Sequence, residues 1–119
     1  MLARGPWDFV QIQLNYYDWF HGTARALYEI LREHDIPIMV MEPAHGGMLA
    51  DLPEAGRNLL LTAKPGATAA SWAFRFLRTL PGIAVVLSGM SSLEQVKDNV
   101  QTFSHDKPLS EQEIALVRQ

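Results

Sequence analysis

The stretch IAVVLSGMSSLEQVKDN, from Ile83 to Asn99, decides the fold. It begins as an apolar run, breaks at Ser88-Gly89 and continues at once into residues that cap helices. Continuous runs of Val, Ile and Leu are typical of strands buried in a parallel sheet, and Ser-x-x-Glu or Ser-x-x-Gln is typical of a helix start. The first backbone N–H groups of a helix have no partner inside it and bind anions well. The stretch therefore predicts a strand, a turn suited to a phosphate, and a helix.

Strands and helices alternate along the rest of the chain. Period-2 and near-continuous apolar runs predict strands, and apolar residues at i, i+3, i+4 and i+7 predict helices. The predicted strands are Phe9–Tyr16, Ile36–Glu42 and Ile83–Leu87. The predicted helices are Gly22–His34, Leu52–Lys64, Thr68–Leu80, one from Ser91 or Ser92 to Phe103, and one that begins at Ser110. Such alternation predicts parallel strands joined by right-handed crossovers, and the fold class is α/β.

Side-chain spacing predicts the buried face of each helix. On the helix over residues 22–34 and on the helix after the turn, the residues expected to be buried are Ala24, Leu27, Tyr28, Leu31, Leu93, Val96 and Val100. Arg75 falls opposite the apolar face of the helix over residues 68–80. Arg25 and Glu29 have the i,i+4 spacing of an ion pair, and Ser110 and Glu113 have the spacing of a capping box.

The first predicted strand has one polar side. Its residues alternate between an apolar side and a side that carries Gln11, Gln13 and Asn15. Three polar amides on one side of a strand need either solvent or polar partners. An exposed edge strand accounts for this pattern, and so does a closed barrel in which Gln11 faces a ligand. The sequence leaves both interpretations open.

Composition limits the class of protein. The chain has 119 residues, 48% of them hydrophobic, and a formal charge of -3, which fits one globular unit and argues against nucleic acid or an anionic membrane as a partner. It has no cysteine, and its four histidines have no metal-ligand spacing, so no metal site is expected. No apolar stretch is long enough for a membrane span and no signal peptide is evident, so a cytoplasmic location is expected.

Three motifs, in this order, carry a resemblance to a known family. They are WDFVQIQLNYYDW, IPIMVMEPAHGG and VVLSGMSSLEQVKDNV. Together they resemble the C-terminal half of the aldo-keto reductases, and more narrowly the bacterial and archaeal branch whose full-length members often carry an iron–sulfur tail. The resemblance implies a partial (β/α)8 TIM barrel, in which residues 1–119 supply strands six to eight with their helices and the N-terminal half is absent. It also implies NADP(H), with NAD(H) as the alternative, bound at the C-terminal ends of the strands.

The resemblance assigns the nicotinamide and pyrophosphate ends of the cofactor to the first two motifs. Gln11 matches the glutamine that holds the nicotinamide carboxamide, and its amide offers the donor and the acceptor that a carboxamide requires. Met41 stands where many relatives place an aromatic ring against the nicotinamide. The loop that passes the pyrophosphate in relatives corresponds to Glu42, Pro43, Ala44, His45, Gly46 and Gly47. Its Gly-Gly pair is expected to let backbone N–H groups approach the pyrophosphate.

The third motif is assigned to the adenosine end of the cofactor. Asn99 matches the asparagine that contacts the adenine amino group, and it shares one helical stripe with Gln95 and Ser92. The segment that binds the adenosine 2′-phosphate in relatives corresponds to Gly89, Met90 and Ser91. Many NADPH-specific relatives carry basic residues in this motif, whereas Gly89 and Gln95 stand at those places here. The resemblance therefore leaves the choice between NADP and NAD open.

The resemblance assigns no catalytic residue to this chain. In the family, a tyrosine assisted by lysine, aspartate and histidine protonates the carbonyl, and strands one to four contribute all four side chains. No residue here matches them, so the chain is expected to carry the cofactor-binding region of a carbonyl or aldehyde oxidoreductase and to be inactive alone. The alternatives are a non-catalytic nucleotide-binding or self-associating half-barrel, and an unrelated α/β module such as a flavodoxin-like domain. The expected partners are a nicotinamide dinucleotide and either the missing N-terminal half or a second copy joined through the exposed strand edges.

Overall fold

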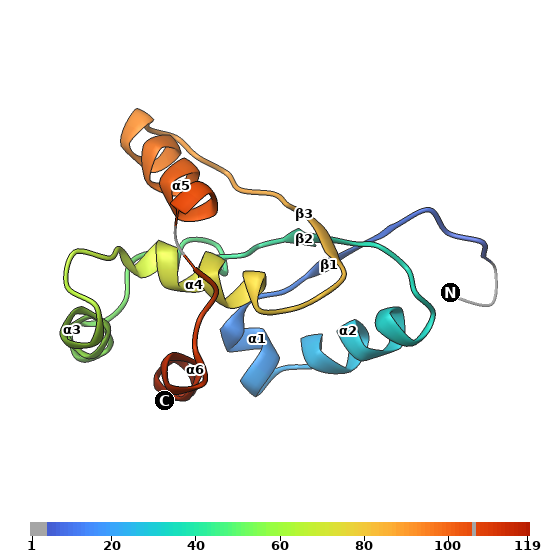
Figure 1. Cartoon of the computed structure of the whole chain (residues 1–119), viewed down its shortest axis with the longest axis horizontal. Coiled ribbons are helices and arrows are strands. Elements are labelled where there is room, and N and C mark those ends of the chain that lie inside the picture. The colour runs from blue at the N-terminus through green and yellow to red at the C-terminus, as the bar shows by residue number, and fades with distance from the viewer. Residues whose placement is uncertain (1–4, 106) are drawn as a thin grey trace.

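The structure is a computed structural model that describes residues 5–105 and 107–119 (Figure 1). Its strands are β1 (Val10–Gln13), β2 (Ile38–Met41) and β3 (Ile83–Val86). Its helices are α1 (Tyr16–His21), α2 (Ala24–Glu33), α3 (Glu54–Ala63), α4 (Ala69–Arg78), α5 (Leu93–His105) and α6 (Glu111–Arg118). Each strand and helix that the sequence predicts is present, although the strands are shorter than predicted. The sequence does not predict α1.

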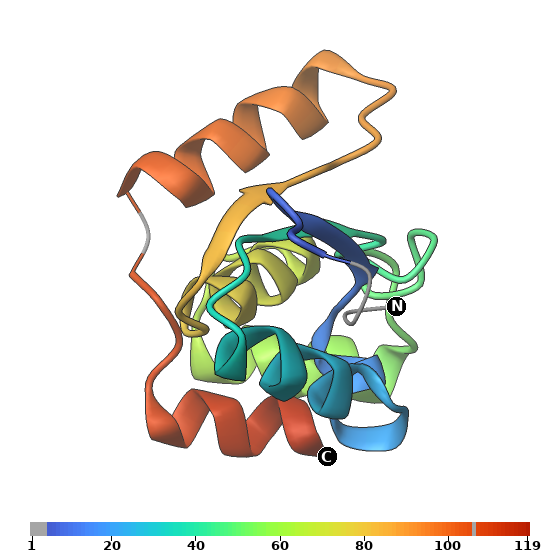
Figure 2. The ribbon, with the colours of Figure 1, turned by 90° about the vertical axis from the view of Figure 1, so that its right-hand side faces the viewer.

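The three strands form one parallel sheet in the order β1-β2-β3. The Ile38 N–H donates to the Gly82 carbonyl at 3.1 Å, where the ladder between β2 and β3 begins. Figure 1 and Figure 2 show α1, α2 and α4 on one side of the sheet, and α5 lies beyond β3, where it contacts α4 rather than the sheet. The predicted α/β class with parallel strands is confirmed.

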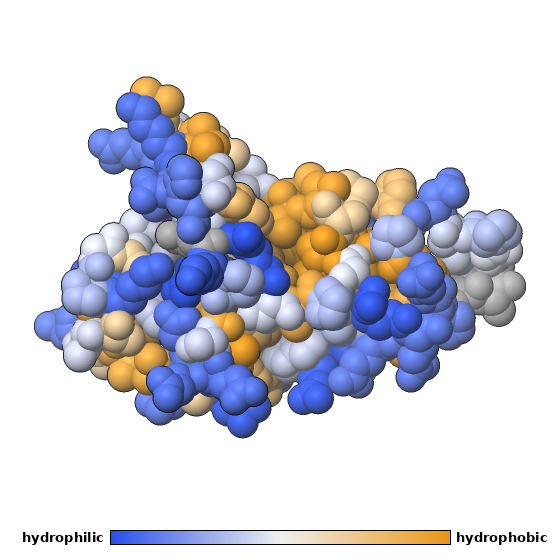
Figure 3. Space-filling model, viewed as in Figure 1, coloured by the Kyte–Doolittle hydropathy of each residue, from blue (hydrophilic) through white to orange (hydrophobic). Residues whose placement is uncertain are grey.

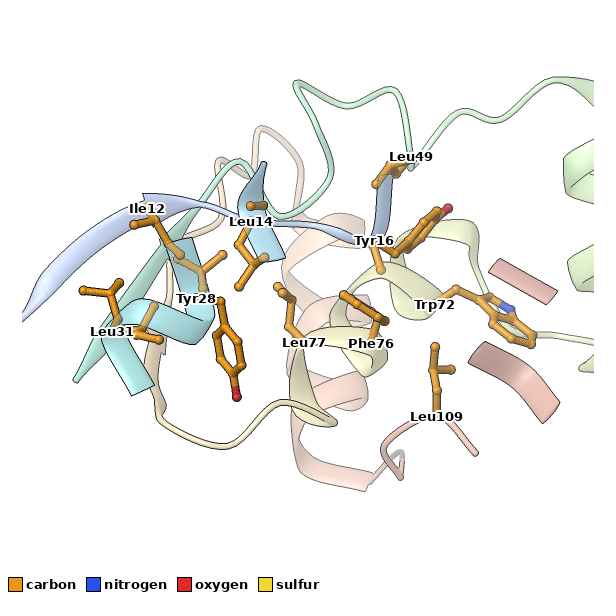
Figure 4. Close-up of a cluster of buried hydrophobic side chains, with 14 of the residues drawn as sticks. Ile12, Leu14, Tyr16, Tyr28, Leu31, Leu49, Trp72, Phe76, Leu77 and Leu109 are labelled. Carbon is orange, nitrogen blue, oxygen red and sulfur yellow. The ribbon is translucent and has the colours of Figure 1, made fainter. Parts of the chain in front are cut away.

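The core lies between the sheet and the helices on its covered side (Figure 4). Leu14, Ile38 and Val40 are completely buried there. The rings of Tyr16 and Phe76 meet edge to face with their centroids 6.1 Å apart, a favourable geometry for an aromatic pair. Because Tyr16 belongs to α1, the helix that the sequence does not predict supplies part of the core.

β1 ends earlier than the sequence predicts. The alternating pattern continues to Tyr16, whereas β1 ends at Gln13 and α1 begins at Tyr16. Asn15 is completely buried rather than on an exposed polar side. Its side-chain oxygen accepts from the Asp18 N–H at 2.8 Å, and its amide donates to the Glu42 carbonyl at 2.9 Å. Asn15 is therefore the N-cap of α1, and asparagine ends the strand because its side chain competes for local backbone groups.

One residue of the predicted apolar face of α2, and the whole predicted apolar face of α5, are exposed in this chain. Leu27 on α2 is 46% exposed, although the rest of its predicted stripe is buried. On α5 the exposed members are Leu93 at 67%, Val96 at 37% and Val100 at 59%. A hollow of about 360 Å³ lies between α4, β3 and the end of α5. The prediction that these four side chains are buried is wrong for this chain, because no element of the described ranges covers them.

Arg75 is buried, contrary to its predicted place on the polar side of α4. Its Nη2 atom donates to both carboxylate oxygens of Glu113, at 2.9 and 3.0 Å, and its Nε donates to the Lys107 carbonyl at 2.7 Å. The predicted capping box of Ser110 and Glu113 is confirmed, so one carboxylate both caps α6 and neutralises Arg75. An arginine is tolerated inside a protein when it is paired and hydrogen-bonded in this way.

Candidate functional site

A cleft of about 530 Å³ opens at the C-terminal ends of β2 and β3. Its walls come from the loop after β2, the turn after β3, α5 and one face of α4. The sequence-predicted site residues that line it are Met41, Glu42, Pro43, Gly46, Gly47, Gly89, Met90, Gln95 and Asn99. Gln11 and Ser91 lie outside the lining, but each is hydrogen-bonded to a residue that lines it. The fold thus gathers residues of the second and third motifs around one hollow and places Gln11 of the first motif beside it.

Gln11 and Met41 meet at the edge of the cleft, on the open face of the sheet. The Gln11 amide donates to the Met41 sulfur at 3.3 Å, and both side chains are exposed. Sulfur is a weak hydrogen-bond acceptor, so the Gln11 amide is able to leave the Met41 sulfur and donate to a stronger acceptor. β1 is an edge strand of the described sheet and Gln13 is exposed as well, which fits the edge-strand interpretation of the polar side. A ligand-facing role for Gln11 stays a prediction.

The loop after β2 is built from tight turns. Glu42 and His45 have φ angles of 54° and 51°, in the left-handed region that side chains seldom adopt, and Gly46 and Gly47 have φ angles of 66° and 91°. The Gly47 N–H donates to the Ala44 carbonyl at 3.1 Å. This donor is used within the turn, and the expected approach of the Gly-Gly pair to a pyrophosphate stays a prediction.

A polar network holds this loop at its first residue and at His45. Asp18 of α1 accepts from Gln13 at 2.9 Å, from Asn15 at 2.8 Å and from Nδ1 of His45 at 3.3 Å. Burial alone would raise the pKa of Asp18, but these hydrogen bonds and the charge of His45 outweigh it and hold the pKa below its ordinary value. Because Asn15 also donates to the Glu42 carbonyl, the network connects the start of the loop to His45.

The turn after β3 is tied to α5 by side-chain hydrogen bonds. The Asn99 amide donates to the Ser88 hydroxyl at 3.1 Å. The Gln95 side chain accepts from the Ser91 N–H at 2.7 Å, and the Gln95 N–H donates to the Ser92 hydroxyl at 3.2 Å. Ser92 rather than Ser91 therefore caps the helix, and Gln95 holds the turn in place.

Two backbone donors of this turn remain unpaired beside the cleft. Within the described ranges, nothing accepts a hydrogen bond from the N–H groups of Gly89 and Met90, and both residues line the hollow. Gly89 does not have a left-handed φ, and a Cβ added there would meet no atom within 4 Å. The fold does not require glycine at this position, and the missing side chain leaves the turn open to close approach by a ligand.

Sequence reasoning does not select several residues of the cleft wall. They are Ala50, Ala70, Phe74, Leu87, Ser88 and Asp98. Asp98 could have been found, because it directly precedes Asn99 and follows Gln95 by three residues on one helix. Phe74 packs against Phe103 with ring centroids 5.3 Å apart. The sequence pattern of such an apolar residue is the same whether it lines a cleft or fills the core, so it could not have been identified in advance.

No group of three or more His, Cys, Asp or Glu side chains in residues 5–105 and 107–119 could hold a metal ion. Over the same residues, none of the helices combines the length and the apolar character that a membrane crossing requires.

The sequence matches a known protein family over its whole length. The family model described as the aldo/keto reductase family matches residues 1–119. The chain belongs to the aldo-keto reductase family. A comparison with curated proteins finds no match.

Solved aldo-keto reductases share the fold of this chain. It is similar to aldo-keto reductase AKR11C1 from Bacillus halodurans, with a TM-score of 0.75 to both the apo and the holo form. The sequence identity is 21% to the apo form and 22% to the holo form. It is also similar to the thermostable aldo-keto reductase Tm1743 in complex with the inhibitor epalrestat, with a TM-score of 0.72 and 19% identity. These alignments cover 98%, 98% and 97% of this chain, but 44%, 43% and 40% of the other chains. The chain spans less than half the length of these proteins, and the predicted partial TIM barrel is confirmed.

Proposed function

We propose that this aldo-keto reductase chain is the C-terminal region of an oxidoreductase barrel, and that its cleft binds a nicotinamide dinucleotide, NADP(H) or NAD(H). One observation carries the proposal. Gln11, the loop of residues 42–47 and the turn of residues 88–91 meet at the C-terminal ends of adjacent parallel strands. Barrel enzymes keep their active sites at this end. The bound cofactor would supply the hydride for carbonyl reduction.

The residues present fit such a cofactor chemically. The volume of the cleft is in the range of small-molecule sites. The Gln11 amide can donate to and accept from a carboxamide, and the Asn99 side chain, held on Ser88, can accept from an amino group. The unpaired N–H groups of Gly89 and Met90 precede the N-terminus of α5, which favours an anionic oxygen.

The other predicted site residues would shape the cleft or contact the cofactor weakly. Met41 offers a polarizable thioether to an aromatic ring. Gln95 holds Ser91 and therefore the conformation of the turn. Pro43, Gly46 and Gly47 set the course of the loop, and Glu42, an acid, suits a hydroxyl group rather than a phosphate.

The proposal places the other half of the active site outside this chain. The chain covers 44% of a solved relative, and no residue matches the catalytic groups that the family resemblance assigns to strands one to four. We infer that residues 1–119 are the C-terminal portion of a single barrel domain and do not reduce carbonyls alone. The cytoplasmic location expected from the sequence stays a prediction.

A second candidate function is a non-catalytic half-barrel that binds a nucleotide or associates with itself. It is favoured by the apolar surface that the sheet exposes. Val85 and Leu87 are 42% and 41% exposed, and Figure 3 shows hydrophobic residues gathered above the sheet. β1 and β3 are both unpaired on their outer edges in the described structure. Surfaces and edges of this kind are normally covered, either by the rest of a barrel or by another copy.

Cofactor fluorescence tests the proposed function directly. NADH and NADPH are titrated into the 119-residue chain and into the Gln11→Ala and Asn99→Ala variants, with circular dichroism to establish folding. Saturable binding that both substitutions weaken several-fold is expected. Gln101→Ala is the matched control, because Gln101 is an exposed amide on α5 that does not line the cleft. A folded chain that binds neither cofactor contradicts the proposal.

Adding the N-terminal half of an aldo-keto reductase barrel separates the two candidate functions. Carbonyl reduction that appears only in the mixture supports the enzyme fragment. Cofactor binding that persists in a stable complex without any turnover supports the non-catalytic half-barrel.

A further inference from the structure

A second pocket, of about 400 Å³, lies between α1, α3 and α6 (Figure 1). The loop after β2 completes its wall, and no residue lines both this pocket and the cleft at the strand ends. The wall is mainly leucine and other apolar residues, and none of the described residues that line it is aspartate, glutamate, lysine or arginine. A pocket of this size and character favours an uncharged small molecule.

Tyr16 brings a polar group to this pocket. The residue is 7% exposed and lines the pocket, and none of the described residues exchanges a hydrogen bond with its hydroxyl. The hydroxyl oxygen is not among the fully enclosed atoms that lack a partner, so the small exposed part of Tyr16 includes it. Figure 4 shows this oxygen on the side of Leu49, which also lines the pocket. A buried tyrosine hydroxyl normally has a partner, and here the space for one is the pocket.

The Tyr16 hydroxyl is suited to donate. Burial raises the pKa of Tyr16 to about 12, so the hydroxyl keeps its proton at neutral pH. A protonated phenol donates one hydrogen bond. An ether, carbonyl or hydroxyl oxygen of a ligand is therefore the group that this side chain would hold.

Gly56 keeps the pocket open at a cost to α3. It lies inside the helix and lines the pocket, and glycine is less stable than alanine at such a position. Its φ is not left-handed, and a Cβ added there would come no closer than 3.8 Å to its nearest neighbour, Leu52, which is an ordinary contact. The fold therefore does not require glycine here, and its missing side chain leaves space for a ligand.

We propose that the pocket binds a small uncharged molecule with an apolar body and one oxygen that accepts a hydrogen bond from Tyr16. The body would be buried against the leucines of α3 and α6, and the oxygen would satisfy the hydroxyl. The inference goes beyond the proposed function and does not depend on it, because the two hollows have no lining residue in common.

Two naphthalenes of nearly the same shape test the hydrogen bond. 2-Methoxynaphthalene has an ether oxygen and 2-ethylnaphthalene has none, and the fluorescence of each is followed as the 119-residue chain is added. Both are expected to bind saturably, and the methoxy compound several-fold more tightly, because the ethyl compound leaves the Tyr16 hydroxyl without a partner. Tyr16→Phe is expected to remove this preference while the ethyl compound still binds.

Substitutions of Gly56 locate the binding site. Gly56→Ala is expected to raise the thermal midpoint and weaken the binding of both naphthalenes, and Gly56→Phe is expected to abolish it by filling the pocket. Leu61→Phe is the matched control, because Leu61 is exposed on the same helix and does not line the pocket. Val85→Ser removes apolar surface from the open face of the sheet and should leave the binding unchanged. Circular dichroism establishes that each variant is folded.

Four results would overturn the inference. The first is a folded chain that binds neither naphthalene saturably, and the second is equal affinity of the unaltered chain for the two compounds. The third is binding that Val85→Ser removes and Gly56→Phe does not, which places the probes on the open face of the sheet. The fourth is binding that appears only when an oligomer is diluted, which shows that a second copy fills the pocket.

Discussion

Two glycines of the cleft have different physical roles, and substituting each by alanine is expected to have a different effect. Gly47 has a φ of 91°, which a residue with a Cβ adopts only with strain, whereas Gly89 has no left-handed φ and has open space around it. Gly47→Ala is expected to lower the free energy of unfolding by about 1 kcal/mol. Gly89→Ala is expected to change it by less than about 0.5 kcal/mol and to weaken dinucleotide binding several-fold, because the new methyl group projects into the cleft. Urea denaturation and NADH titration of both variants measure this; a Gly89→Ala variant that binds normally contradicts the ligand role of the turn.

Asp18 makes stability depend on acid pH, with a sign that follows from its lowered pKa. Its ordinary pKa is 3.8, and the folded-state pKa is lower, so the stabilisation is complete above 3.8 and is lost as the pH falls below this value through the folded-state pKa. Asp18→Asn is expected to cost about 1 to 2 kcal/mol at pH 7, because charge-assisted hydrogen bonds are lost. Thermal denaturation between about pH 7 and pH 3 should show the two proteins converging at the acid end. Asp51→Asn is the control, since the Asp51 side chain is 93% exposed, and an equal loss in that variant would count against the network.

At the scale of elements, the ion pair of Arg75 and Glu113 holds α6 against α4. Burial alone would raise the pKa of Glu113, but hydrogen bonds from Ser110 and Arg75 and the charge of Arg75 lower it. Glu113→Gln leaves a buried arginine without its counter-charge and is expected to cost about 2 kcal/mol, below the range for fully buried pairs because the Glu113 side chain is 22% exposed. Glu29→Gln serves as the comparison variant. Glu29 forms the predicted i,i+4 ion pair with Arg25, which is confirmed at 2.9 Å. That pair is exposed and should contribute less than about 0.5 kcal/mol to the free energy of unfolding measured by urea denaturation. Equal effects of the two substitutions would show that α6 is held by its apolar contacts.

The elements that the sequence predicts have local signals, and those that it misses depend on distant partners. The capping box of Ser110 and Glu113 and the apolar run of β3 can be identified from a few neighbouring residues. Arg75 is buried because Glu113, 38 positions away, neutralises it, and helical periodicity contains no information about that pair. The predicted site residues lie around one cleft because the motifs follow consecutive parallel strands, whose C-terminal ends are adjacent. Asp98 lines the same cleft and has a local signal that was available, because it directly precedes Asn99 and follows Gln95 by three residues on one helix.

At the scale of the whole molecule, the chain is a sheet covered on one face. The helices pack against the face that carries Ile12 and Val40, whereas the other face, the edges of β1 and β3 and the apolar side of α5 have no cover within the described residues. The hydrophobic contribution of about 25 cal/mol per Å² makes such a surface favourable to bury. A chain that spans less than half of its solved relatives is therefore expected to hide this face against another polypeptide when it is purified alone.

Light scattering and a hydrophobic dye measure this expectation. The isolated chain is expected to be oligomeric at micromolar concentration, and the N-terminal half of a barrel is expected to displace the copies and lower dye binding. Val96→Glu with Val100→Glu is expected to shift the chain towards the monomer without lowering its thermal midpoint, because both side chains are already exposed. Leu61→Glu on α3 is the control for a charge placed at an exposed apolar residue elsewhere and should leave the oligomer intact. A monomer that binds no dye at any concentration would show that the open face is stable in water, and the chain would then need neither a second copy nor the missing half of the barrel in order to stay folded.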